Sequence, residues 1–235
     1  DTTDRNRTSP FAFTGNKFEF RMVGSSDSIA CANIMLNAAV AQSLKCYADE
    51  LEQAEDFNTA LHERIKRTIK EHKRIIFNGN GYSDEWVAEA ERRGLPNIKS
   101  MIEAVDTLTT EKSVNLFEKF GIFTKTELES RAEVLYETYA KTINIEALTM
   151  IDMASKQYVP AIVKYTKSLA DTVVAVKDAG ADAQVQTEIL KAVNGKLGEV
   201  KSALAKLEEA EAKAAAMDNV KDQAFFYKDV VKEDM

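Results

Sequence analysis

A single apolar stripe at helical spacing runs from residue 128 to residue 176 and restricts this part of the chain to one long helix. Pro160 lies near its middle, where a missing N–H and a bulky ring predict a kink. Residues 179–182, Ala-Gly-Ala-Asp, predict a turn, and a second stripe follows over residues 185–207. Two apolar stripes joined by a tight turn predict an antiparallel helical hairpin.

Shorter helices are expected before this hairpin. The 235 residues include only nine Gly and three Pro, so few positions force a helix to end. Ser25-Ser26-Asp27 resembles a helix N-cap, and we expect a helix from there to about residue 55. Its first half, Ile29 to Val40, is apolar almost all round, so we expect it to be buried. Asn33 and Asn37 lie one turn apart in this half. They are either hydrogen-bonded amides of the core or contacts for a ligand.

A short charged stretch near the N-terminus has the alternation of a half-buried β-strand. Lys17, Glu19 and Arg21 fall on one side, and apolar residues alternate with them on the other. Arg5 and Arg7 add two guanidinium groups upstream. This arrangement suits a site for anionic ligands and a metal, although a solvated strand face with cross-strand ion pairs explains the same pattern.

The sequence of this stretch resembles that of a known protein family. NRTSPFAFTGNKFEFRM, followed by GSS and a long apolar helix, resembles the end of the catalytic domain of glutamine synthetases, most closely the large type III form. The resemblance is specific over residues 4–51, and beyond residue 55 it rests on a helical tail and a final FYKD segment. It implies residues 1–55 as the C-terminal part of a catalytic domain and residues 56–235 as a C-terminal helical region. The expected fold is mainly α, with one N-terminal strand from an α+β domain.

The resemblance also implies a reaction, in which ATP and glutamate form γ-glutamyl phosphate and ammonia displaces the phosphate. By the family pattern, Glu19 is a ligand of Mg²⁺ or Mn²⁺, and Arg21 binds the carboxylate of glutamate. Arg7 reaches glutamate and the γ-phosphate, and it is the expected catalytic residue. Lys17 approaches the phosphates of ATP. These roles match residue chemistry, because hard cations prefer carboxylate oxygens and a guanidinium forms paired hydrogen bonds with a carboxylate.

Some residues depart from the family pattern. Ala12 stands where the shorter synthetases have a further phosphate-binding Arg, and Val23 stands where a Pro often follows the strand. These differences favour the type III branch and leave the nucleotide contacts less defined. The remaining metal ligands of the family are expected upstream of Asp1, so residues 1–235 alone are predicted to be inactive.

Composition excludes some partners and leaves other readings open. A net charge of −7 argues against nucleic acid and anionic membranes as partners. The two cysteines are too far apart to pair, which suits the cytoplasm.

By resemblance we expect a homo-oligomer, a dodecamer of two stacked hexameric rings, with parts of residues 125–215 at subunit contacts. The alternatives are an all-helical scaffold without catalysis and a γ-glutamyl ligase acting on another amine.

Overall fold

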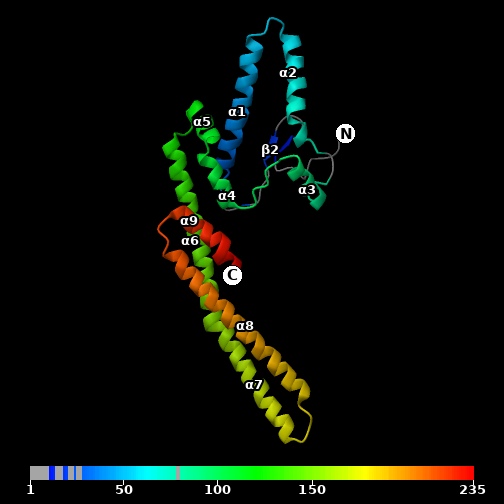
Figure 1. Ribbon diagram of the computed structural model, residues 1–235, viewed down its shortest axis with the longest axis vertical. Coiled ribbons are helices and arrows are strands. Elements are labelled where there is room, and N and C mark those ends of the chain that lie inside the picture. Colours follow the sequence, from blue (N-terminus) through cyan, green and yellow to red (C-terminus); the bar gives the residue numbers. More distant parts are fainter. Residues whose placement is uncertain (1–10, 14–17, 21–23, 25–27, 78–79) are drawn as a thin grey trace. The chain divides into compact units, whose positions relative to one another are not determined.

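The chain is mainly helical, which confirms the predicted fold class in its broad form. The computed structural model describes residues 11–13, 18–20, 24, 28–77 and 80–235 (Figure 1). The chain divides into two units. Unit 1 holds residues 1–99 and 111–124, and unit 2 holds residues 100–110 and 125–235. The expected division at residue 55 is a different one and stays a prediction.

Unit 1 begins with a small strand pair. Strand β1, Phe11–Phe13, pairs antiparallel with β2, Phe18–Phe20. The predicted alternating stretch 17–22 includes β2, but its flanking residues lie outside those described. Whether β2 belongs to the sheet of a catalytic domain therefore stays a prediction.

The helices of unit 1 are α1 (Ala30–Glu52), α2 (Phe57–His72), the 3₁₀ turn η1 (Lys73–Ile75), α3 (Asp84–Arg92) and α5 (Glu111–Lys119). Helices α1 and α2 form an antiparallel pair (Figure 1). Asp56 caps α2 by accepting a hydrogen bond from the Asn58 N–H, at 3.1 Å. Glu50 of α1 then pairs with Arg64 and Arg67 of α2. Two ion pairs from Glu50 thus link α1 to α2.

The first half of α1 is not buried, so that expectation is wrong for the described chain. Ile29 is 66% exposed and Val40 43% exposed, and Ala38 alone in α1 is buried. Asn33 and Asn37 are exposed rather than core amides. The expected N-cap at 25–27 lies outside the described residues, and α1 is described from Ala30. An apolar helix surface is buried only where another element covers it, and few of the described residues pack on this stretch.

Unit 2 is built around the long hairpin. Its elements are α4 (Met101–Asp106), the 3₁₀ turn η2 (Thr107–Thr109), α6 (Lys125–Met153), the π-helical turn η3 (Ala154–Tyr158), α7 (Val159–Asp178), α8 (Gln184–Ala215), α9 (Val220–Phe226), the π-helical turn η4 (Tyr227–Val231) and α10 (Lys232–Asp234). The irregular turn η3 ends two residues before Pro160, where the sequence predicts a kink. Because proline cannot donate a backbone hydrogen bond, a local change of helix geometry there is expected.

The turn of the hairpin falls at the predicted place. Helix α7 ends at Asp178, Gly180 adopts a left-handed φ of +77°, and α8 begins at Gln184. Such a φ suits glycine because it has no Cβ to clash. Helices α7 and α8 then lie side by side along their length (Figure 1).

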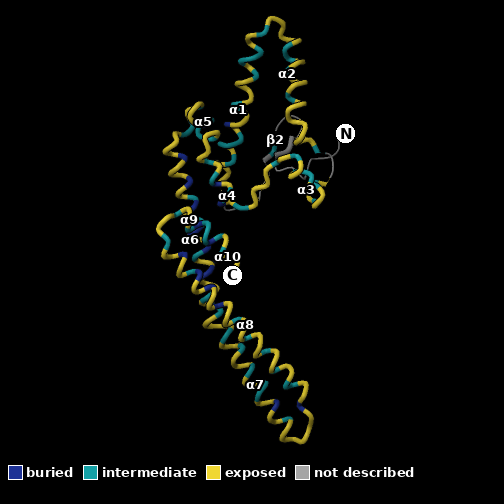
Figure 2. The backbone as a smooth tube through the Cα atoms, viewed as in Figure 1, coloured by how far each residue is buried: buried dark blue, intermediate teal, exposed yellow. Residues whose placement is uncertain are grey.

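The core of unit 2 lies where α6, α8 and the C-terminal segment meet (Figure 2). Its largest fully buried side chains include Tyr227, Ile102 and Val231. Alanines on the facing helices, such as Ala147 and Ala214, are completely buried and let the backbones approach closely. The expectation that Phe225–Tyr227 docks on the body is confirmed.

The hairpin beyond this core buries much less than its stripes suggest. Met150, Tyr165, Val185 and Ile189 all belong to the predicted stripes, yet each is exposed. A pair of helices can bury only the narrow seam between them, so flanking stripe residues keep contact with solvent. Among the described residues, none of the helices combines the length and apolar character needed to cross a membrane.

Candidate functional site

Glu19 is the one residue of the expected site that the structure describes. It is the central residue of β2, lies opposite Ala12 of β1 in the antiparallel register, and is half-buried. A carboxylate held on paired backbone is a suitable ligand for a hard dication, because its position is fixed before the metal binds. Arg7, Lys17 and Arg21 lie outside the described residues, so their positions relative to Glu19 stay predictions.

No cluster of three His, Cys, Asp or Glu side chains suited to a metal occurs among the residues that the structure describes. One carboxylate does not make a metal centre, since Mg²⁺ takes six oxygen ligands. Glu19 could therefore supply only one ligand of such a site. Its chemistry fits a magnesium or manganese ion, and the other ligands must come from elsewhere.

Asn33 and Asn37 border a shallow groove of about 400 Å³ in unit 1. The groove lies between α1 and the segment that follows α5, where Phe120 and Ile122 complete the wall. The ligand-contact alternative for these amides agrees with their exposure, whereas the core alternative does not. None of the described residues that line this groove is titratable, so they offer no acid–base chemistry there.

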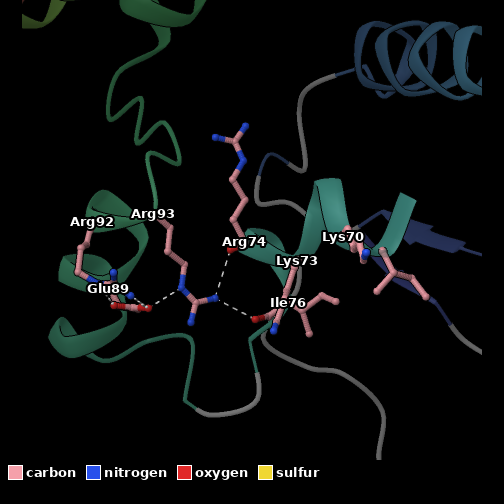
Figure 3. A pocket seen from close by; sticks show the side chains of 8 residues that line it. Lys70, Lys73, Arg74, Ile76, Glu89, Arg92 and Arg93 are labelled. Carbon is pink, nitrogen blue, oxygen red and sulfur yellow. Dashed lines mark hydrogen bonds and ion pairs between the residues drawn. The ribbon is translucent and has the colours of Figure 1, made fainter. Parts of the chain in front are cut away.

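Sequence reasoning missed a cationic cleft between the end of α2 and α3 (Figure 3). It is open to solvent and has a volume of about 660 Å³, and its lining residues are Ile69, Lys70, Lys73, Arg74, Ile76, Glu89, Arg92 and Arg93. The sequence alone shows these cations as two separate pieces of surface helix. A signal existed in the density of basic residues over 66–74 and 92–93, but the sequence did not show that the two pieces meet.

Arg93 joins the two walls of this cleft. Its Nε donates to Glu89 Oε1 at 2.5 Å, and its Nη1 donates to the carbonyl oxygens of Ile76 at 2.9 Å and Arg74 at 3.2 Å. Arg92 also donates to Glu89, through Nε at 2.6 Å and Nη2 at 2.7 Å. The hydrogen bonds from Arg92 and then Arg93 lower the pKa of Glu89 to about 2. Glu89 is thus ionised and fully engaged at neutral pH.

Comparison with known proteins decides the family. The sequence model described as "Glutamine synthetase C-terminal domain" matches residues 60–177. The chain belongs to the glutamine synthetase C-terminal domain family. The family match covers α2 to α7 but begins after the predicted site at residues 7–21.

Three proteins with related names extend this similarity. A "Glutamine synthetase" of Butyrivibrio fibrisolvens is 41% identical over 246 aligned positions, covering 100% of this chain and 34% of that protein. A "Type-3 glutamine synthetase" of Dictyostelium discoideum is 46% identical over 176 positions, covering 74% of this chain and 24% of that protein. A "Glutamine synthetase" of Bacteroides fragilis is 36% identical, covering 99% of this chain and 33% of that protein. The chain therefore spans about a third or less of the length of these glutamine synthetases.

Proposed function

We propose that this chain is the C-terminal part of a glutamine synthetase that ligates ammonia to L-glutamate at the expense of ATP, through γ-glutamyl phosphate. The observation that carries the proposal is the 41% identity along the whole chain to a protein named glutamine synthetase. That similarity includes the N-terminal residues that hold the predicted site, which the family match at 60–177 leaves out.

In this proposal the N-terminal strand region supplies four side chains. Arg21 binds the carboxylate of glutamate, Arg7 contacts glutamate and the γ-phosphate, and Lys17 contacts the ATP phosphates. Cations placed around a phosphoryl group offset the negative charge that spreads over its oxygens during transfer. Glu19 contributes one oxygen ligand to a bound Mg²⁺ or Mn²⁺. When bound, that ion would neutralise charge on the phosphate oxygens.

The helical region is proposed to serve assembly instead of chemistry. Exposed apolar residues along the hairpin, such as Val174 and Val185, offer surface that a neighbouring subunit could cover. We propose a homo-oligomer, a dodecamer of two stacked hexameric rings, located in the cytoplasm. Neither nucleic acid nor a membrane is proposed as a partner.

The test is an assay of the full-length polypeptide that contains this chain. We expect phosphate release from ATP to require both glutamate and ammonium, together with Mg²⁺ or Mn²⁺. Replacing ammonium by methylamine or a polyamine tests the alternative amine, since a γ-glutamyl ligase for amines would prefer those compounds. ATP turnover that ignores glutamate would overturn the proposal, and complete absence of turnover would favour the scaffold alternative.

A matched control uses residues 1–235 alone, which we expect to be inactive because further metal ligands are proposed to lie outside them. Glutamate- and ammonium-dependent ATP hydrolysis by this piece would show that the site is complete within it. That result would preserve the reaction but would overturn the proposed division of the site.

A further inference from the structure

The cleft between α2 and α3 concentrates positive charge on an acidic chain. Among the described residues that line it, five are cations and one is a carboxylate, a formal charge of +4 from 5 − 1, whereas the whole chain carries −7. A surface that is merely solvated does not need its positive and negative side chains to be separated in this way. A concave surface of one sign focuses the electrostatic potential and raises the local concentration of oppositely charged small molecules.

Two of the cations are committed to structure. Arg93 and Arg92 share Glu89, and Arg93 also holds the carbonyl oxygens of Arg74 and Ile76 (Figure 3). Three cations remain. Lys70 and Lys73 form no ion pair with any carboxylate among the described residues, and Arg74 makes one long hydrogen bond of 3.4 Å, to the Gly94 carbonyl oxygen.

The three remaining cations come from consecutive turns of one helix. Lys70 lies in the last turn of α2, and Lys73 and Arg74 lie in η1. The spacing of three residues brings Lys70 and Lys73 to one side, whereas the Arg74 side chain points away from that of Lys73 (Figure 3). Basic residues at a helix C-terminus also offset the helix dipole, which offers a purely structural reading. Each helix end carries only about −0.5 charge. Two such ends therefore leave the cleft clearly positive.

We propose that this cleft is a binding site for a small phosphate-bearing polyanion, held by Lys70 and Lys73. The volume of about 660 Å³ lies within the range of small-molecule pockets, roughly 300–1,000 Å³. Lysine binds phosphate as a point charge with three rotatable donors, so Lys70 and Lys73 suit several phosphate oxygens. Ile69 and Ile76 provide apolar wall beside them. The proposed ligand contacts include none of the residues proposed for catalysis.

The experiment measures lysine acylation, residue by residue, in the full-length protein with and without tripolyphosphate. With the probe at about ten times its Kd, mass action predicts roughly tenfold slower acylation of Lys70 and Lys73. Lys66 is the matched control, because it lies on the same helix, pairs with Glu63 and does not line the cleft. Mass spectrometry of single sites separates this cleft from any phosphate site elsewhere in the protein.

A variant pair then tests the residues. Lys73→Gln should weaken the tripolyphosphate Kd, read from protection of Lys70, by about tenfold or more, because a charge-assisted contact is lost. Lys66→Gln should leave that Kd unchanged. Equal protection of Lys66 and Lys70, no protection of Lys70, or an unaltered Kd in Lys73→Gln would each overturn the proposal. None of these readouts depends on ligase activity.

Discussion

Replacing Tyr227 by alanine should release the C-terminal segment from the core of unit 2. Its side chain is 2% exposed and is among the largest that are fully buried. Its hydroxyl accepts a hydrogen bond from Asn144 Nδ2 at 2.8 Å, and the same amide donates to Glu211 Oε1 at 2.8 Å. Tyr227 thus combines packing with a polar link that fixes α6 against the C-terminal segment and α8.

The two contributions can be separated by size. Truncating a buried aromatic residue to alanine costs about 3–5 kcal/mol, since both transfer energy and packing around a cavity are lost. Tyr227→Phe keeps the ring and loses only the hydroxyl, so it should cost about 0.5–1.5 kcal/mol. Asn144 retains Glu211 as an acceptor in that variant. Tyr165→Ala is the matched control, because that tyrosine is 54% exposed and should cost no more than about 0.5 kcal/mol.

Hydrogen exchange of peptides from residues 220–235 provides the assay. An opening free energy reduced by 3–5 kcal/mol corresponds to roughly two to four orders of magnitude faster exchange in Tyr227→Ala. Tyr227→Phe should accelerate exchange by about tenfold or less. Equal exchange in wild type and Tyr227→Ala would refute the reasoning, because the segment would then be held by contacts other than this side chain.

Three further predictions concern other parts of the chain. In the full-length protein, Arg21→Lys should lower kcat/KM for glutamate by about tenfold to a hundredfold with little change in KM for ATP. Glu19→Gln should raise the concentration of Mg²⁺ that activity requires. If both variants had wild-type kinetics, the strand would not be part of the site. Deleting residues 181–235 should change oligomer size, measured by light scattering, before it changes turnover. If the assembly stayed intact but activity were lost, this region would have to be assigned to the active site. Because the pKa of Glu89 is lowered from 4.5 to about 2, its stabilisation of the α3–η1 contact is complete above pH 4.5 and lost as pH falls toward 2. Glu89→Gln should remove that acid dependence from hydrogen exchange in α3, and an unchanged profile would contradict the assignment.

Local patterns predicted the hairpin well. The spacing of residues 128–176 and the turn at 179–182 are properties of the nearby sequence, and the helices follow them closely. The docking of Phe225–Tyr227 was also predictable, because three consecutive aromatic residues are costly to leave in water. In both cases the apolar pattern contained the necessary information.

Burial of α1 was not predictable from its own residues. Ile29 and Val40 show that an apolar helix has surface to bury, but the pattern does not identify the element that covers it. The link from Arg93 to the Ile76 carbonyl oxygen was hidden for a similar reason, because it joins residues from separate helical segments. As a pair in the sequence, Glu89 and Arg93 resemble an ordinary exposed ion pair. Of the predicted site, Glu19 alone falls within the described residues.

The hairpin of α7 and α8 has a consequence for how this family can vary. Because α7 packs mainly on α8, extra residues inserted at equal number in α7 and in the part of α8 that faces it would meet little else. Seven residues restore nearly the same helix face, so a matched pair of seven-residue insertions would preserve the seam. Each would add about 10 Å to the hairpin at 1.5 Å per residue. Hairpin length is therefore a dimension that evolution or an engineer can adjust without repacking the core around Tyr227.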